Sequence, residues 1–104
     1  MRYLLKWNLL PVPHDMAKIA LTLLKGSQAY TGGLAKKGVI TEMWNRTDGT
    51  GGIALIEADS NDALFKLLAE EPYGPFLQFS VTPLSDINIA YESAKKQLEQ
   101  MIGK

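Results

Sequence analysis

Hydrophobic residues recur with two different periods along the chain, and these periods predict alternating strands and helices. Residues 3–10 are rich in apolar and aromatic side chains and end at Pro11-Val12-Pro13, which is typical of a strand. After Asp15, a suitable N-cap, apolar residues follow helical spacing: Met16, Ile19, Ala20, Leu23 and Leu24. This first helix is expected to reach about Ala35, unless Gly26 weakens it or Gly32-Gly33 ends it earlier.

A glycine-rich turn divides the middle of the chain into two predicted strands. Residues 39–46 form the first of them, and the Asp48-Gly49 turn leads to the apolar run 53–56, which favours a hairpin. Ser60 is then expected to cap a second helix with the buried stripe Leu64, Leu67 and Leu68. A fourth strand over residues 76–83 precedes an amphipathic helix over residues 87–102.

The order of these elements predicts the fold class. Strand, helix, strand, strand, helix, strand and helix make an α+β, ferredoxin-like βαββαβ arrangement with an extra C-terminal helix. At 104 residues the chain fits one domain and is too short for two ordinary ones. We therefore expect a single domain over residues 1–104, in which residues 86–104 are a helical extension.

The predicted sheet has two apolar faces, and this favours dimerisation. Right-handed crossovers place both crossover helices on the same face, so the other face should be polar in a monomer. Residues 53–56 are instead all apolar, so apolar side chains point to both faces of the sheet. Such a face would expose several hundred Å² of apolar surface, so we expect a homodimer or a higher homo-oligomer. The alternative is that the helix over residues 87–102 covers this face within one chain.

Charge and composition exclude several classes of function. Eleven basic residues balance eleven acidic ones without forming a basic stripe, so no nucleic-acid partner is expected. The chain has no cysteine, which excludes disulfides, thiolate nucleophiles and zinc–thiolate sites. Lys6 and Asn8 interrupt the first apolar run too early for a signal peptide, and no transmembrane run follows. A cytoplasmic protein with no membrane partner is expected.

Two further motifs are interpreted as structural. His14, the only histidine, could perform acid–base chemistry, but its place between Pro13 and Asp15 favours a loop residue. One histidine without cysteines makes no convincing transition-metal site, so no metal is predicted. The glycines of residues 48–52 join two strands instead of opening a helix, which favours a turn over a phosphate-binding loop.

Polar residues inside the predicted strands are the candidates for chemistry. They are Lys6, Asn8, Glu42, Glu57, Gln78 and Ser80. Buried charges must be paired or hydrogen-bonded, and perturbed ones often mark sites. Lys6 is expected to pair with Glu42 or Glu57 in a cleft walled by Tyr3 and Trp44, and to move a proton next to a carbonyl. Lys6 and Glu42 are the catalytic candidates, and the substrate-binding candidates are Tyr3, Asn8, Trp44, Glu57 and Gln78. The alternative is that these residues are edge, rim or interface positions.

The second half of the chain resembles the muconolactone isomerase family. The resemblance lies in Ile56-Glu57-Ala58-Asp59-Ser60-Asn61-Asp62-Ala63-Leu64, Leu67-Leu68, Pro75-Phe76 and Val81-Thr82-Pro83-Leu84, with Trp44 earlier in the chain. It covers residues 1 to about 84 and leaves residues 87–102 beyond the family's usual end. It implies two ferredoxin-like chains packed into a dimeric α/β barrel. It also implies an isomerase that shifts a lactone double bond by proton transfer and needs no cofactor.

Two hypotheses about function follow. The first is a small-molecule enzyme or binder resembling muconolactone isomerase, in which Lys6 stands at a position that is charged in the family. The second is a non-catalytic dimeric barrel that serves assembly or ligand sensing. Two residues depart from the family pattern: Leu4 replaces a histidine, and Asn45 stands where an arginine directly follows the tryptophan. A cleft that holds Lys6 and a carboxylate would favour the first hypothesis, and a closed, dry pocket the second.

Overall fold

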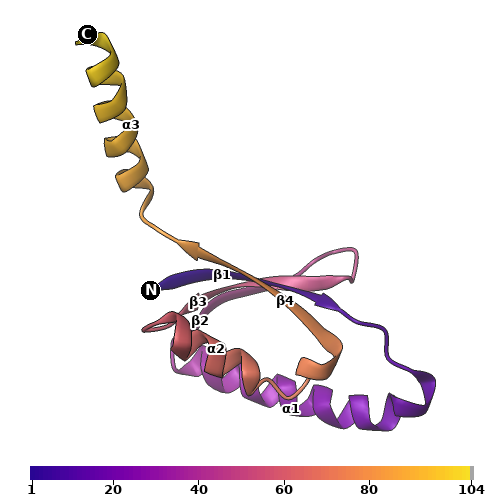
Figure 1. Ribbon diagram of the computed structural model, residues 1–104. Helices are drawn as coiled ribbons and strands as arrows, with labels where there is room; N and C mark the ends of the chain where they lie inside the picture. The colour runs from indigo at the N-terminus through magenta and orange to yellow at the C-terminus, as the bar shows by residue number, and fades with distance from the viewer. Residues whose placement is uncertain (104) are drawn as a thin grey trace.

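The computed structural model describes residues 1–103, which form four strands and three α-helices (Figure 1). The strands are β1 (Arg2–Leu9), β2 (Ile40–Asn45), β3 (Gly51–Glu57) and β4 (Leu77–Leu84). The helices are α1 (Ala17–Lys36), α2 (Asn61–Ala69) and α3 (Ile87–Ile102), and short 3₁₀ turns cover His14–Met16 and Gly74–Phe76. None of the helices in the described part of the chain is long and apolar enough to cross a membrane.

The four strands form one antiparallel sheet in the order β2-β3-β1-β4. Helices α1 and α2 lie on the same side of this sheet, and the other side carries no helix (Figure 1). The predicted α+β, ferredoxin-like arrangement is confirmed, as is the presence of a further helix at the C-terminal end. The sheet therefore has a helix-covered face and an uncovered face.

Side chains of alternate residues divide between these two faces, as the pleat of a strand requires. The buried core lies between the sheet and the two helices and consists of Tyr3, Leu5, Ile40, Ala54, Ile56 and Leu64. In β3 the residues Ala54 and Ile56 are buried, whereas Ile53 and Leu55 remain partly exposed on the uncovered face. The two-faced apolar strand inferred from the sequence is therefore present.

One predicted helix cap needs correction. Asp15 does not cap α1: it lies in the 3₁₀ turn, and Met16 is the N-cap residue, without a side-chain hydrogen bond. The predicted end of α1 near Ala35 is confirmed, since the helix ends at Lys36. The helix continues through Gly26, whose missing side chain allows close approach, because a Cβ there would lie 3.3 Å from Pro72 Cβ. Ser60 is confirmed as the cap of α2, since its Oγ accepts a 3.1 Å hydrogen bond from the Ala63 N–H.

Gly52 of β3 lies at a position of close contact with the two neighbouring strands. Gly52 lies opposite Trp7 of β1 and Asn45 of β2. A Cβ on Gly52 would lie 2.7 Å from Trp7 Cη2, and it would also overlap Trp7 Cζ2 and the Trp44 carbonyl oxygen. The indole of Trp7 therefore occupies the space that any side chain at residue 52 would need.

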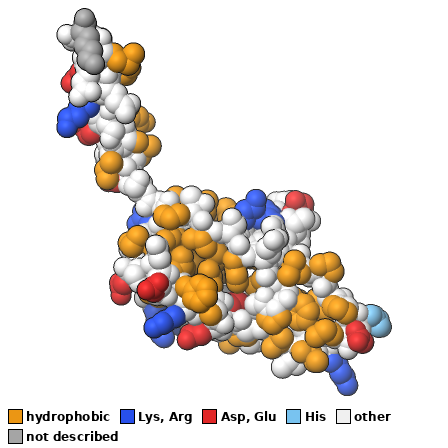
Figure 2. All heavy atoms as spheres, in the orientation of Figure 1, with side chains coloured by type: hydrophobic (Ala, Val, Ile, Leu, Met, Phe, Trp, Pro, Cys, Tyr) orange, Lys and Arg blue, Asp and Glu red, His pale blue; other side chains and the backbone are white. Residues whose placement is uncertain are grey.

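Helix α3 extends away from the rest of the molecule (Figures 1 and 2). Every residue from 81 to 103 is exposed, and the molecule measures 68 × 28 × 23 Å along its principal axes. Hydrophobic side chains are visible along the helix in Figure 2. The alternative in which this helix folds back over the uncovered sheet face is therefore not the arrangement in this structure.

Candidate functional site

The uncovered face of the sheet brings together most of the polar residues singled out from the sequence. Strand register places Lys6 opposite Ile53 on one side and Ser80 on the other. Trp44 is also opposite Ile53, from the other neighbouring strand. Lys6 and Trp44 are thus on two strands that flank the same apolar residue.

Glu42 joins this face because of an irregularity in β2. The pairing shifts between Ile40 and Glu42, so Ile40 pairs with Ile56 while Glu42 pairs with Leu55. Such a bulge changes which face the following residues occupy. Simple alternation from the buried Ile40 would have placed Glu42 among the residues under the helices. Because of the bulge at Thr41, Glu42 and then Trp44 lie on the uncovered face.

The centre of the uncovered face is an apolar floor with polar groups around it. Leu4, Ile53 and Leu55 form the floor, and each of them is partly buried. Lys6 borders the floor on β1, while Glu42 and Trp44 border it on β2. Trp44 is 52% exposed, so its indole is available to a ligand or a partner.

Lys6 and Glu42 do not form the direct ion pair that the sequence suggested; no ion pair of residues 1–103 includes either of them. Two strand spacings and a two-residue offset separate their Cα atoms by roughly 12 Å. Lysine and glutamate side chains that stand upright from the sheet keep their charged ends about this far apart, which leaves room for a small ring between them. The spacing suits two groups that act on one ligand better than a salt bridge.

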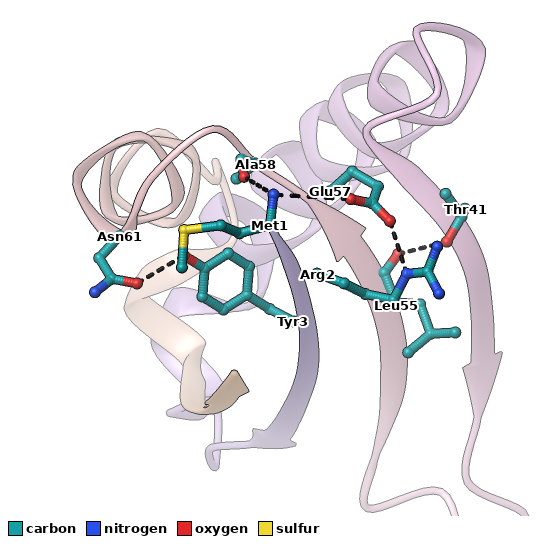
Figure 3. Close-up of polar contacts among 8 residues, drawn as sticks. All are labelled: Met1, Arg2, Tyr3, Thr41, Leu55, Glu57, Ala58 and Asn61. Atoms are coloured by element: carbon teal, nitrogen blue, oxygen red, sulfur yellow. Dashed lines mark hydrogen bonds and ion pairs between the residues drawn. The ribbon is translucent and has the colours of Figure 1, made fainter. Parts of the chain in front are cut away.

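Glu57 belongs to a separate cluster at the end of the face (Figure 3). Its Oε1 accepts a 2.7 Å hydrogen bond from Arg2 Nε, and its Oε2 lies 4.0 Å from the N-terminal amine. This contact with Glu57 raises the pKa of the Arg2 guanidinium. Glu57 therefore pairs with Arg2 and not with Lys6, and the structure assigns it to holding the strand ends together.

Tyr3 lies on the opposite face of the sheet from Lys6 and Trp44. It is only 1% exposed, and its hydroxyl donates a 2.6 Å hydrogen bond to Asn61 Oδ1 (Figure 3). Residues Tyr3 and Trp44 consequently do not form one wall, contrary to the arrangement expected from the sequence. Tyr3 instead connects β1 to α2.

Asn8 and Gln78 lie opposite each other at the other end of the uncovered face. The side chain of Arg46, a residue that the sequence analysis did not select, extends over β3 to this position and donates a hydrogen bond from Nη2 to Asn8 Oδ1. Its Nη2 also donates to Thr50 Oγ1 at 2.9 Å. The only available signal in the sequence was its position two residues after Trp44.

Arg46 has unused hydrogen-bonding capacity. Its Nη1 is buried and has no hydrogen-bond partner within residues 1–103. A buried donor without a partner is uncommon in native proteins and calls for an explanation. The Thr50 hydroxyl that Arg46 contacts donates in turn to Asp48, and this bond lowers the pKa of the Asp48 carboxyl. The guanidinium is thus held by the hairpin turn beside the amide of Asn8, whose partner on β4 is Gln78.

A second candidate site lies between the sheet and the helices, and sequence reasoning missed it. It is a cavity of about 230 Å³ lined mostly by apolar side chains, among them Leu5, Trp7, Leu34, Ala54 and Phe79. Its polar wall includes Tyr30, whose hydroxyl donates to the Leu67 carbonyl at 2.7 Å, and Glu71. Burial raises the pKa of the Tyr30 hydroxyl, and the charges of Glu70 and Glu71 raise it further. The Tyr30 hydroxyl and the Glu71 carboxylate both have hydrogen-bond partners already. The cavity could therefore hold an apolar group, but it has few free polar groups for catalysis.

No three His, Asp or Glu side chains of residues 1–103 come together in a way that could hold a metal ion. Of the acidic residues of the uncovered face, Glu57 pairs with Arg2, whereas Glu42 lies on another strand and is in no ion pair of residues 1–103. The groups available for chemistry on this face are therefore the Lys6 ammonium and the Glu42 carboxylate. At one end of the face they are joined by the Arg46 guanidinium and the amides of Asn8 and Gln78.

Comparison with known proteins gives one family and a consistent fold. The sequence profile of the muconolactone delta-isomerase family matches residues 1–88. A crystal structure of muconolactone isomerase is similar with a TM-score of 0.73 at 24% identity, covering 83% of this chain and 90% of that one. The 5-chloro-2-hydroxyhydroquinone dehydrochlorinase from Burkholderia phenoliruptrix AC1100, in complex with 2,5-dihydroxybenzoquinone, gives a TM-score of 0.62 at 16% identity, covering 82% and 94%. A search of curated proteins finds no match.

Proposed function

Because the chain belongs to the muconolactone delta-isomerase family, we propose that it isomerises a small lactone or a similar oxygenated acid by proton transfer. The observation that carries this proposal is the uncovered sheet face. There Lys6, Glu42 and Trp44 surround the apolar floor formed by Ile53 and its neighbours. A ring placed on that floor has an ammonium on one side and a carboxylate on the other.

The two charged groups have complementary roles in such a reaction. The Glu42 carboxylate removes a proton from a carbon next to the substrate carbonyl and returns it at another carbon, so the double bond shifts and no atom is lost. The Lys6 ammonium stabilises the negative charge that develops on the carbonyl oxygen meanwhile. Trp44 packs against the ring. The reaction needs no redox partner, because substrate and product are isomers.

The other end of the face suits an acidic group on the substrate. Arg46 places a guanidinium there, and guanidinium groups bind carboxylates with good geometry. Asn8 holds Arg46 in place through a hydrogen bond, and Gln78 lies opposite Asn8 on β4. A substrate carboxylate at this end would direct the ring toward the floor between Lys6 and Glu42.

We also propose that a second copy of the chain completes the site as a homodimer. Small-molecule sites usually bury about 70–90% of their ligand, which a flat sheet face does not achieve alone. The floor residues Leu4, Ile53 and Leu55 and the half-exposed Trp44 form an apolar surface that a partner sheet would cover. Two sheets packed through this face would enclose the ligand between them.

An isomerisation assay with muconolactone tests the proposal. We expect turnover without added cofactor, and we expect Glu42→Gln to lower kcat/KM by at least ~100-fold, the usual scale of acid–base catalysis. Glu70→Gln, at the exposed end of α2, is the matched control and should leave turnover unchanged. Absence of both binding and turnover of muconolactone would contradict the proposed function. Full activity of Glu42→Gln would contradict the role of this carboxylate.

A further inference from the structure

Helix α3 has an apolar side that no other part of residues 1–103 covers. The large side chains Ile87, Tyr91, Leu98 and Met101 are each about 60% or more exposed, and Ala94 lies in the middle of the same side. All of the helix except its first two residues lies beyond the part of the chain that matches the family, which ends at residue 88. Its function is therefore a property of this chain that the proposed isomerase site does not account for.

The spacing of this apolar side is typical of paired helices. Ile87, Tyr91, Ala94, Leu98 and Met101 follow one another at intervals of four, three, four and three residues. This is the alternation of a and d positions in a coiled coil, in which each apolar seam packs against another helix. These five residues form the α3 seam. The small Ala94 at its centre lets two backbones approach closely.

A partner is needed because the helix is marginal by itself. Asp86 caps its N-terminus by accepting a 2.8 Å hydrogen bond from the Asn88 N–H. Isolated helices of about this length are nevertheless only marginally stable in water, and most gain their stability from packing. Since α3 extends away from its own sheet and helices, the packing surface must come from another molecule.

We propose that the α3 seam pairs with the α3 seam of a second copy of this chain. The seam is complementary to itself: it is apolar, and the charged residues of α3 (Glu92, Lys95, Lys96 and Glu99) sum to zero and lie outside it. Four large side chains supply on the order of 400 Å² per copy, about half of the ~800 Å² per partner of a stable interface. The uncovered sheet face supplies the remaining area, so the two surfaces act together in one dimer.

Cysteine cross-linking tests this pairing directly, because the chain contains no cysteine of its own. Ala94 is seven residues from both ends of the seam, so it faces Ala94 of the second copy whether the helices run parallel or antiparallel. A disulfide requires Cβ atoms within about 3.5–4.5 Å. Under mild oxidation Ala94→Cys should therefore form a covalent dimer, and Ser93→Cys, on the outer side, should do so at least ~tenfold more slowly.

A second pair of variants shows whether the seam causes the pairing. In the Ala94→Cys background, Leu98→Glu should reduce cross-linking about tenfold by placing a charge in the seam. Gln100→Glu adds the same charge outside the seam and should leave cross-linking unchanged. All of these positions are exposed, so none of the substitutions disturbs the core.

Two results would overturn the proposal. One is equal cross-linking of Ala94→Cys and Ser93→Cys, which would indicate random collision. The other is an Ala94→Cys chain that stays monomeric under denaturing conditions although Leu98→Glu still breaks the native assembly. That result would place α3 on a different surface of the neighbour, such as the groove between α2 and β4 beside the exposed Phe65. Cross-linking yield and muconolactone turnover are separate readouts, so a failure of the isomerase proposal leaves this test of the α3 seam intact.

Discussion

Replacing Gly52 with alanine is expected to destabilise the protein by about 3 kcal/mol or more, the upper range for overpacking a filled site. The added Cβ would meet the indole of Trp7 on one side and the Trp44 carbonyl on the other. Neither can move freely, because one is packed into the core and the other is backbone of the neighbouring strand. A small domain with a total stability of about 5–15 kcal/mol would lose a large part of it.

Gly33→Ala is the matched control for this experiment. Gly33 lies inside α1, and no atom beyond the adjoining turns of its own helix comes within 4 Å of a Cβ built there. Alanine at a helix interior is favoured over glycine by roughly 0.5–1 kcal/mol, so this variant should be slightly more stable than the parent. Urea denaturation at equal protein concentration measures the free energy of unfolding of both variants. A Gly52→Ala midpoint equal to that of the parent would show that Trp7 does not occupy the space assigned to it.

Replacing Lys6 with methionine is expected to lower kcat/KM for muconolactone by at least ~100-fold without changing stability. Methionine keeps the length and apolar stem of the side chain and removes the ammonium that faces the floor. Because Lys6 is exposed and lies in no ion pair of residues 1–103, its loss should not affect the melting temperature.

Lys25→Met on α1 controls for the general loss of a positive charge. Lys25 is exposed and lies in a helix on the other side of the sheet, so this variant should retain full turnover. Stabilisation of charge in the transition state predicts that Lys6→Met lowers kcat more than it raises KM. An unchanged kcat with a raised KM would assign Lys6 to substrate binding alone. If kcat and KM were both unchanged, Lys6 would have no role in the site.

The fold could be predicted from the sequence because its signals are local. Ser60 caps α2 as expected, and the Asp48-Gly49 turn joins β2 to β3. Alternation along β1 places Tyr3 and Leu5 on one face of the sheet and Leu4 and Lys6 on the other, as the pleat of a strand requires. Capping residues, turns and periodicity act within a few residues of chain, so one sequence contains enough information about them.

The site could be predicted only in part because it depends on pairing across strands. The bulge at Thr41 has no clear sequence signal, yet it decides that Glu42 and Trp44 lie on the uncovered face. The pairing of Glu57 with Arg2 depends on the register of β1 against β3, which also could not be derived from one sequence. Arg46 was missed for the same reason, since its partner Asn8 lies on a strand that is not its neighbour.

The two departures from the family pattern now have a structural context. Leu4 lies opposite Leu55 and contributes to the apolar floor instead of placing an imidazole there. Asn45 pairs with Gly52, on the helix-covered side, whereas the next residue, Arg46, reaches the uncovered face. An arginine is thus available at this end of the site although it is one residue later in the chain.

The central claim is that the ligand binds on the uncovered face and not in the cavity beneath the sheet, and the two tryptophans report on these places separately. Trp44 lies on the uncovered face, and Trp7 lines the cavity. Titration of muconolactone into Trp7→Phe, which keeps only Trp44, should change the fluorescence in a saturable manner. The same titration of Trp44→Phe should leave the Trp7 emission unchanged. A saturable response of Trp7 with none from Trp44 would contradict the claim and place the ligand in the cavity.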